Sequence, residues 1–457
     1  MTYYLDPFGC VKNQVDAENM MALLNQAGWS VAENSTDADL IIVNSCGFIE
    51  SAKQESINAV LSWRKAYPGK KILLAGCLSQ RYAKELSASL PEADGFFGVS
   101  NLAGIVEAAE QIMQPLTSHR NLPAAKAPQP GKRPLLSMPG SAYVKISEGC
   151  DNCCSFCAIP LIRGKLKSRS VPDVIKECKT LLGRGIRELC LVGQDTGSYG
   201  LDLAGASSRL PQLLKALSGL EGNFRVRLLY IHPDHFPLPI LEIMEQDKRL
   251  IPYFDIPFQH GSEKILKAMN RSLNAASYLK LIKTIRQRLP DAVIRSTFMT
   301  GFPGETEEDF ALLLEFQEKA SLDWLGCFTY SREENTPSYV MKGRVAKKAA
   351  ARRKQLVEEQ QVPITERQMD RFVGRVFDVL VEEKFEPLAA EEETEQARKE
   401  AEKGLVEENL YLGRLPCQAP EVDGSAVIFS RQVLEPGSMV SCKVISRAGF
   451  DLEVRPV

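Results

Sequence analysis

Four cysteines fall within the eight residues from Cys150 to Cys157. Taken as Cys150, Cys154 and Cys157, they form a C-x3-C-x2-C pattern that directly follows an apolar run at 142–146. Closely spaced cysteine thiolates hold iron–sulfur clusters, and ferredoxin-type clusters use four of them. Three ligands leave one iron of a cubane cluster open to a small molecule. The pattern therefore predicts a reaction centre and not only an electron carrier.

Three further cysteines each follow a run of residues that is typical of a β-strand. They are Cys10, Cys46 and Cys77, and the runs before them are 3–5, 40–45 and 72–76. Helical patterns lie between the runs, and this alternation predicts a parallel α/β sheet. Ligands bind beyond the carboxyl ends of such strands, so the three thiols can converge. One buried cysteine is commonly just a small apolar side chain, but three at equivalent turns favour a shared metal site.

The length of 457 residues predicts more than one domain. We expect an N-terminal domain with a parallel α/β sheet over residues 1–115. A segment rich in Pro, Ala, Gly and Lys predicts a linker over 116–139. A central unit follows over 140–371, and a C-terminal domain follows over 372–457.

The central unit repeats strand and helix patterns six times. Its strand candidates are Ala142–Ile146, Glu188–Val192, Phe224–Tyr230, Tyr253–Pro257, Ala292–Phe298 and Trp324–Tyr330. Its helix candidates include Val171–Leu182, Arg209–Leu217, Pro239–Glu245, Ala276–Arg288 and Glu307–Lys319. This repetition predicts a partial (β/α)6 barrel with its active site at the carboxyl rim of the strands. The cysteine stretch follows the first strand and so belongs to that rim. A charged stretch, Val345–Phe372, predicts a connecting helix interrupted near Pro363.

The last part of the chain has short alternating strand candidates separated by turns. This pattern predicts a small antiparallel β-barrel, with a charged, helical insertion at Pro387–Lys403. From Phe372 to Val457 there are ten Lys or Arg and seventeen Asp or Glu, a net charge of −7. A barrel that bound RNA would be expected to carry a basic face. The acidic balance instead predicts a basic partner such as a protein.

The bulk composition is that of a globular chain without a membrane segment. The net charge is −2, and no apolar run approaches the length of a membrane span. The first residues lack the pattern of a signal peptide, so we expect a cytoplasmic protein. Twelve cysteines allow a disulfide framework, but clustered cysteines in a long chain without a secretory signal more often bind metal or catalyse.

The whole chain resembles the methylthiotransferases of the radical S-adenosylmethionine superfamily. The two cysteine triads carry this resemblance, together with the stretches Gly149–Pro160, Gln194–Thr196 and Pro257–His260. Within the family, Cys46–Ser56 and Ala419–Gly424 are most similar to the members that modify ribosomal protein S-twelve. Two departures are Val11, where the family usually has proline, and the additional thiol of Cys153.

The resemblance implies two 4Fe-4S clusters, one on each triad, and a C-terminal TRAM barrel. The cluster on the second triad would bind S-adenosylmethionine and produce a 5'-deoxyadenosyl radical, which takes a hydrogen from the β-carbon of an aspartate. The cluster on the first triad would carry the sulfur, which a further S-adenosylmethionine methylates. An electron donor such as flavodoxin or ferredoxin is implied, and the chain is expected to be a monomer. The candidate cofactor-holding residues are Gln194, Asp195, Gln259, Arg295 and Glu305, each of which is alternatively a structural residue of the rim.

The expected partner is ribosomal protein S-twelve, which as a ribosomal protein is strongly basic. Glu421 and Asp423 are the residues of the acidic barrel predicted to contact it. One alternative is a tRNA methylthiotransferase that acts on a modified adenosine and uses the barrel for RNA. Another is a non-enzymatic iron–sulfur or zinc protein that docks on the ribosome, although zinc prefers four closed ligands and the sequence offers two separate triads.

Overall fold

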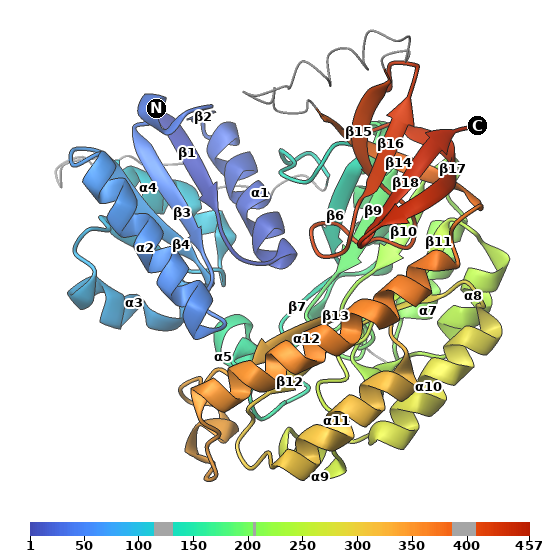
Figure 1. The fold of residues 1–457 in the computed structure, drawn as a ribbon. Coiled ribbons are helices and arrows are strands. Elements are labelled where there is room, and N and C mark those ends of the chain that lie inside the picture. Colours follow the sequence, from blue (N-terminus) through green and yellow to red (C-terminus); the bar gives the residue numbers. More distant parts are fainter. Residues whose placement is uncertain (114–130, 204–206, 386–407) are drawn as a thin grey trace, which may run out of the picture.

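The computed structural model describes residues 1–113, 131–203, 207–385 and 408–457 (Figure 1). They form a five-stranded sheet, a six-stranded sheet and a closed five-stranded barrel, with a small two-stranded sheet beside the second. The expected insertion at Pro387–Lys403 and most of the expected linker, at 116–130, lie outside the described residues. No helix within the described ranges has the length and apolar character needed to cross a membrane.

The N-terminal domain is a parallel sheet with helices on both faces. The strand order is β2-β1-β3-β4-β5, and every pairing is parallel. The elements are β1 (Thr2–Pro7), α1 (Val11–Gln26), β2 (Ser30–Val31), β3 (Leu40–Ser45), α2 (Glu50–Ala66), β4 (Lys71–Gly76), α3 (Cys77–Ser89), β5 (Gly95–Phe97) and α4 (Ile105–Met113).

Strand β3 explains why both faces of this sheet are covered. Leu40 and Ile42 pack with α1 and α4, whereas Ile41 and Val43 pack with α2 and α3. A strand that is apolar at every position must be buried on both sides, and parallel connections supply the helices that bury it.

The central unit is a parallel sheet in the order β13-β12-β11-β10-β9-β6. Because β6 and β13 end this order and do not pair, the sheet is an open, partial barrel, as the sequence predicts. Its strands are β6 (Ser141–Lys145), β9 (Glu188–Val192), β10 (Arg225–Leu228), β11 (Leu250–Asp255), β12 (Val293–Thr300) and β13 (Trp324–Thr329). Its helices are α5 (Ile159–Arg163), α6 (Val171–Gly183), α7 (Leu210–Ser218), α8 (Pro239–Gln246), α9 (Glu263–Ala268), α10 (Ala275–Arg288) and α11 (Glu307–Ala320).

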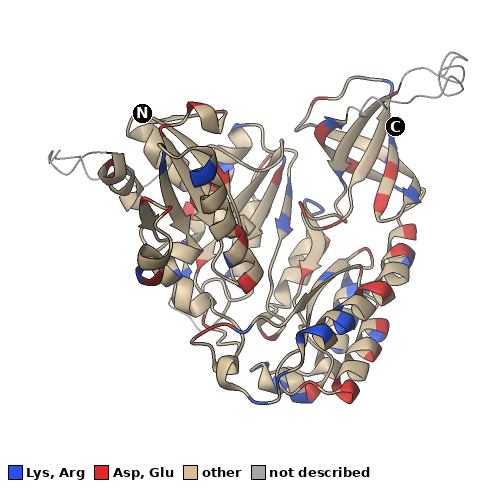
Figure 2. Cartoon of the chain, turned by 60° about the vertical axis from the view of Figure 1, so that its left-hand side comes forward, with Lys and Arg blue, Asp and Glu red and all other residues tan. Residues whose placement is uncertain are grey.

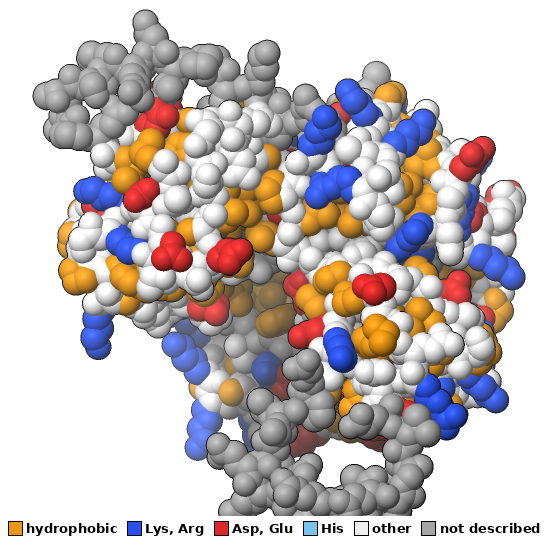
Figure 3. All heavy atoms as spheres, turned by 90° about the horizontal axis from the view of Figure 1, so that it is seen from above, with side chains coloured by type: hydrophobic (Ala, Val, Ile, Leu, Met, Phe, Trp, Pro, Cys, Tyr) orange, Lys and Arg blue, Asp and Glu red, His pale blue; other side chains and the backbone are white. Residues whose placement is uncertain are grey.

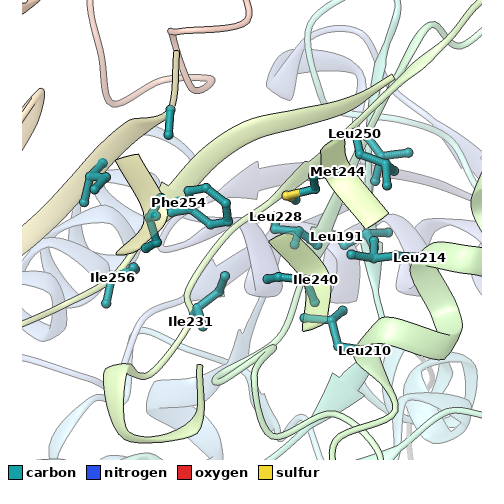
Figure 4. Close-up of a cluster of buried hydrophobic side chains, with 14 of the residues drawn as sticks. Leu191, Leu210, Leu214, Leu228, Ile231, Ile240, Met244, Leu250, Phe254 and Ile256 are labelled. Atoms are coloured by element: carbon teal, nitrogen blue, oxygen red, sulfur yellow. The ribbon is translucent and has the colours of Figure 1, made fainter. Parts of the chain in front are cut away.

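The main apolar core lies between the outer face of this sheet and its helices. Figure 4 shows part of it, where Leu191 and Leu228 from the strands meet Leu214 and Met244 from α7 and α8. Strand side chains alternate between the two faces of the sheet, so the intervening residues point to the inner face. That inner face carries the charged groups described below.

A single helix, α12 (Lys347–Asp370), connects the central unit to the C-terminal barrel. The predicted interruption near Pro363 is wrong, because the helix continues through this residue. Proline inside a helix costs about 3 kcal/mol relative to alanine. Side chains around it offset this cost by anchoring the helix: Gln361 donates a hydrogen bond to the carbonyl of Leu322, and Thr365 donates one to that of Asp323.

The C-terminal barrel closes in the order β14-β15-β16-β18-β17. Its strands are β14 (Val376–Phe385), β15 (Asn409–Arg414), β16 (Ala426–Ser430), β17 (Met439–Ala448) and β18 (Asp451–Pro456). The prediction of a purely antiparallel barrel needs one correction, since β16 and β18 pair in parallel. Five strands cannot alternate in direction around a closed ring, so one neighbouring pair must run the same way.

Candidate metal centre

The loop from Cys150 to Cys157 lies at the carboxyl end of the central sheet, between the short strand β7 (Ser147–Glu148) and α5. Its backbone is fixed at both ends: Cys150 N–H donates to the carbonyl of Gly164 at 3.1 Å, and Cys157 N–H donates to that of Cys154 at 3.0 Å. Gly149 precedes the loop with φ +72°, and a Cβ there would lie 2.1 Å from the Lys165 carbonyl oxygen. Only glycine allows this entry into the loop.

The loop separates Cys153 from the other three thiols. Cys153 is exposed, has φ +51°, and accepts a hydrogen bond from Asn270 through its carbonyl. Burial, with a smaller contribution from the charge of Cys154, raises the pKa of Cys150 and of Cys157 to about 12. Three mutually interacting, partly buried thiols are what the C-x3-C-x2-C assignment requires. Cys153 stands outside this group.

A polar network packs behind Cys154. The Nε2 atom of His232 lies 3.8 Å from Cys154 Sγ and accepts a hydrogen bond from Arg271 at 2.5 Å. Burial, followed by the charge of Arg271, lowers the pKa of His232 to about 3, so the imidazole is neutral at pH 7. The backbone N–H of His232 donates to Asp195, which also accepts from Asn152 at 2.9 Å.

The five candidate cofactor residues differ in how much of their hydrogen-bonding capacity is used. Asp195 is fully committed to the network above, and Glu305 accepts the N–H of Gly301 and, at 3.0 Å, that of Phe302. The other oxygen of Glu305, Oε1, has no hydrogen bond but pairs with Arg353 at 3.2 Å. The amide oxygens of Gln194 and Gln259 are buried and have no hydrogen-bond partner among the described residues. Both follow strands at the same rim as the cysteine loop. Buried acceptors of this kind fit the ammonium group of a bound cofactor.

The second triad forms at three turns of the N-terminal domain. Cys10 precedes α1, Cys46 follows β3, and Cys77 begins α3. The turns approach so closely that a Cβ on Gly47 would lie 2.6 Å from the Cys77 carbonyl oxygen, and one on Gly9 would lie 3.2 Å from Cys46 Cβ. The glycines beside these cysteines therefore allow the three strand ends to meet.

The electrostatics of the three N-terminal thiols are unequal. Burial raises the pKa of Cys77 to about 12, and the charges of Cys10 and Cys46 add to this rise. Burial also acts to raise the pKa of Cys10, but the positive charges of Lys12 and Arg163 outweigh it, so that this pKa is lowered. The three thiols stand on turns that approach one another closely, as the pattern of strand ends predicts.

Arg163 links the two cysteine groups. It ends α5, which follows Cys157, and its Nη2 atom lies 3.1 Å from Cys77 Sγ. The same guanidinium pairs with Asp16 of α1 at 2.8 Å and with Glu148 at 2.9 Å. Cys77 also packs with apolar side chains of the α5 segment, Ala158 and Ile162. The N-terminal triad and the central loop are therefore neighbours across the domain interface.

A second contact joins the N-terminal domain to the segment that follows β13 of the central unit. Glu333 is buried and pairs with Arg81 at 2.6 Å and with Lys53 at 3.2 Å. Neither this contact nor the contact of Arg163 is predicted by the motifs of the sequence. The one local signal is that Arg163 follows the last cysteine by a single short helix, whereas Glu333 has no distinguishing sequence context.

The C-terminal barrel reaches the inner face of the central sheet through its loop 415–424. Trp324 donates a hydrogen bond to the carbonyl of Cys417 at 2.8 Å, and the hydroxyl of Tyr253 donates to Asp423 at 2.6 Å. Arg295 lies between Asp255 at 3.3 Å and Asp423 at 3.4 Å. The side chain of Asp423 has no exposed surface, and burial raises its pKa to about 6.

The prediction that Asp423 contacts a partner is therefore corrected. Its loop folds onto the sheet because Asp423 accepts the hydroxyl of Tyr253 and pairs with the guanidinium of Arg295, so this carboxylate is internal and not exposed. Glu421 differs, since it is exposed, although one carboxylate oxygen lies 3.5 Å from the hydroxyl of Tyr143.

A buried charge cluster fixes the barrel against the sheet near this loop. Glu188 of β9 accepts hydrogen bonds from Arg225, from Arg227 at 3.0 Å and from Arg414 of the barrel at 2.8 Å. Arg414 also pairs with Glu382 at 2.6 Å. Burial acts to raise the pKa of Glu188, but the three arginines outweigh it and hold the pKa well below its usual range.

We expect Glu188→Gln to destabilise the protein by about 3–5 kcal/mol, because it leaves three buried guanidinium groups around a neutral side chain. The midpoint of urea unfolding of the purified chain measures this effect. Glu383→Gln is the matched control, since Glu383 is exposed on β14, the barrel strand that pairs with the strand of Arg414. A change there should stay within about 0.5 kcal/mol. Equal shifts in the two variants would contradict a stabilising role for the cluster.

The arrangement of thiols fits clusters better than single ions. All twelve cysteines are free. Within the described ranges, no three His, Cys, Asp or Glu side chains stand in a group that could hold one metal ion. Three cysteines at each of two sites suit iron–sulfur clusters, which thiolates hold, whereas a structural zinc site would bring four ligands around one centre.

Three segments of the chain match described protein families. Residues 2–98 match the uncharacterized protein family UPF0004, residues 144–316 match the Radical SAM superfamily, and residues 400–457 match the TRAM domain. The first two segments contain the two cysteine triads, and the third covers most of the C-terminal barrel.

Similar proteins extend over nearly the whole chain. The ribosomal protein uS12 methylthiotransferase RimO of Treponema denticola is 46% identical over 98% of this chain and 99% of its own length. The protein of the same name from Pseudothermotoga lettingae is 38% identical and covers 97% of each chain.

Among solved structures, the radical S-adenosylmethionine methyltransferase TsrM of Kitasatospora setae, with cobalamin and a 4Fe-4S cluster bound, has a similar fold. The TM-score is 0.54 with 13% sequence identity, covering 74% of this chain and 73% of that one. At this level of identity the similarity establishes the fold alone.

Proposed function

The chain belongs to the family of ribosomal protein uS12 methylthiotransferases, and from this membership we propose that it attaches a methylthio group to the β-carbon of an aspartate in that ribosomal protein. The observation that carries the proposal is the end-to-end similarity to RimO proteins, joined with the meeting of the two cysteine triads at Arg163. S-adenosylmethionine serves both as the methyl donor and as the source of the radical.

Each triad is proposed to hold one 4Fe-4S cluster. Cys150, Cys154 and Cys157 form the site for the cluster that engages S-adenosylmethionine, and Cys10, Cys46 and Cys77 form the second site. When bound, the clusters and S-adenosylmethionine supply one-electron cleavage of a carbon–sulfur bond and a transferable methylthio group. This chemistry suits an unactivated methylene, whose C–H bond is too weakly acidic for a general base.

The protein's own residues position these groups and exclude water. His232, which accepts a hydrogen bond from Arg271, packs behind Cys154 and supports the position of this thiol. Gln194 and Gln259 offer their unpaired amide oxygens to the cofactor. Arg163 holds Cys77 against the segment that carries the other triad, and this contact fixes the separation of the two sites.

The proposal includes an acidic contribution to partner binding, because a basic ribosomal protein is attracted by negative charge. Eight of the seventeen acidic residues between Phe372 and Val457 lie within 386–407, outside the described residues. Over the described barrel both signs of charge occur (Figure 2), and the face seen from above also mixes them (Figure 3). Glu421 remains the candidate contact residue in the described part of the barrel.

The remaining elements of the proposal are a cytoplasmic location, action as a monomer, and reduction by a flavodoxin or a ferredoxin. The second candidate function is methylthiolation of a modified adenosine in tRNA, which the two cysteine triads alone would equally permit. The extent of similarity to RimO proteins favours the ribosomal protein.

The test is a reaction of the cluster-loaded enzyme with S-adenosylmethionine and a chemical reductant. Purified ribosomal protein uS12 and bulk tRNA are supplied in separate reactions. We expect mass spectrometry to find one methylthio group on an aspartate of uS12 and none on tRNA. Modification of tRNA alone would overturn the proposal in favour of the second candidate.

A further inference from the structure

The first turn of α1 reaches the inner face of the central sheet. Val11 and Val15 of this helix belong to the same buried cluster as Tyr143, Val192 and Leu229 from the strands. In Figure 1, α1 is the part of the N-terminal domain that faces β6. Residues of this turn therefore lie between the N-terminal triad and the interior of the partial barrel.

Lys12 occupies this position and lies over an aromatic ring. Its Nζ atom is 3.4 Å from the ring centroid of Tyr230, the second residue after β10. Tyr230 adopts φ +61°, a left-handed conformation that is rare for a bulky side chain. Backbone strain of this kind persists where surrounding structure enforces it and is concentrated at functional sites.

The charge of Lys12 is not matched by an acidic partner. No carboxylate of the described residues lies within ion-pair distance of its Nζ atom, although the side chain is partly buried. The neighbouring Arg295 pairs with Asp255 and Asp423, and Arg163 pairs with Asp16. The ring of Tyr230 lies beside this partly desolvated ammonium group, and Cys10 is near enough for the two charges to interact, but no carboxylate within the described ranges pairs with it. The carboxylate of a bound molecule would supply the missing partner.

Arg271 is the other cation near the site without a carboxylate partner among the described residues. Its guanidinium donates to the ring of His232, which lies against Cys154, so it belongs to the other cysteine loop. Lys12 instead stands two residues after Cys10, on the side of the N-terminal triad. Arg271 therefore lies at the Cys150–Cys157 loop, whereas Lys12 lies at the N-terminal triad.

We propose that Lys12 binds the side-chain carboxylate of the substrate aspartate and thereby selects aspartate over asparagine. The inference rests on the proposed function and adds the group that recognises the substrate. In aspartate the β-carbon is bonded directly to the carboxylate carbon. A carboxylate held by Lys12 thus places the reacting carbon beside Cys10, where the methylthio group is to be transferred.

The experiment compares uS12 with a uS12 variant in which the modified aspartate is replaced by asparagine. For the wild-type enzyme we expect kcat/KM for the aspartate form to exceed that for the asparagine form by about 100-fold, the effect of losing one partner of a buried charge pair. A wild-type enzyme that modifies both forms equally well overturns the proposal by itself, without any enzyme variant.

The enzyme variants are Lys12→Met, which keeps length and removes charge, and Lys12→Arg, which keeps charge. We expect Lys12→Met to reduce the preference for the aspartate form to a few-fold and Lys12→Arg to retain part of it. Lys70→Met is the matched control, because Lys70 also lies over a tyrosine, Tyr67, at 4.7 Å, but away from both triads. Iron content is measured for each variant to verify that the clusters assemble.

The outcomes separate this inference from the proposed function. A Lys12→Met enzyme that is slower but keeps the full preference for aspartate shows that Lys12 only balances the charge of the cluster on Cys10, and this overturns the inference. A wild-type enzyme that modifies neither form of uS12 overturns the proposed function instead.

Discussion

Cys154→Ala is expected to abolish the formation of 5'-deoxyadenosine, whereas Cys153→Ala is expected to leave it nearly unchanged. The two cysteines are adjacent in sequence, and spacing alone permits either as the middle ligand. The structure separates them. Cys153 is exposed and lies in a left-handed turn that Asn270 fixes. Cys154 lies against His232, and its charge raises the pKa of Cys150 and of Cys157.

Iron content and product formation test this prediction together. Cys154→Ala should lower the iron content from roughly eight to roughly four atoms per chain, because each cubane contains four. Cys153→Ala should retain the iron of both clusters. Both enzymes are reconstituted under anaerobic conditions and analysed by chromatography for 5'-deoxyadenosine. Loss of product in the Cys153→Ala enzyme with full activity of the Cys154→Ala enzyme would reverse the ligand assignment.

Cys46→Ala is expected to separate radical formation from product formation. It removes a ligand of the N-terminal triad but leaves the loop at Cys150–Cys157 intact, so 5'-deoxyadenosine should still form while methylthiolated uS12 falls below detection. Cys46 follows β3 directly, and its N–H donates to Ser56, so the backbone of the turn persists without the thiol. The loss is therefore chemical and not a consequence of unfolding.

Cys178→Ala provides the matched control for this experiment. Cys178 likewise carries a free thiol, but it is fully buried in the main apolar core on α6 and does not lie beside either triad. We expect this variant to form both products at close to the wild-type rate. If Cys46→Ala makes methylthiolated uS12 at the wild-type rate, the N-terminal triad has no part in sulfur transfer.

The sequence was sufficient to predict the two cysteine groups and the sheets that carry them. Cys10, Cys46 and Cys77 each stand at the end of a strand, and strands joined by helices run parallel, so their ends meet at one edge. The same reasoning placed the Cys150–Cys157 loop at the rim of the partial barrel. These predictions succeeded because a local pattern of strand, turn and helix decides where a turn residue emerges.

Predictions failed where long-range packing outweighs local preference. Pro363 was expected to interrupt its helix, but contacts of Gln361 and Thr365 with the preceding segment hold the helix together. Asp423 was expected to contact a basic partner, because it belongs to a barrel with an excess of acidic residues. Its actual partners, Tyr253 and Arg295, come from strands more than a hundred residues earlier.

What the sequence by itself determined is therefore the chemistry available: six cysteines in two triads, each on a strand end of a parallel sheet. Only the tertiary structure decided how these groups stand relative to one another. Arg163 joins Cys77 to the other loop, and Lys12 lies over Tyr230 without a carboxylate partner among the described residues. The physical reason is that ion pairs and ring contacts between domains depend on the packing of whole elements, which no local pattern of residues specifies.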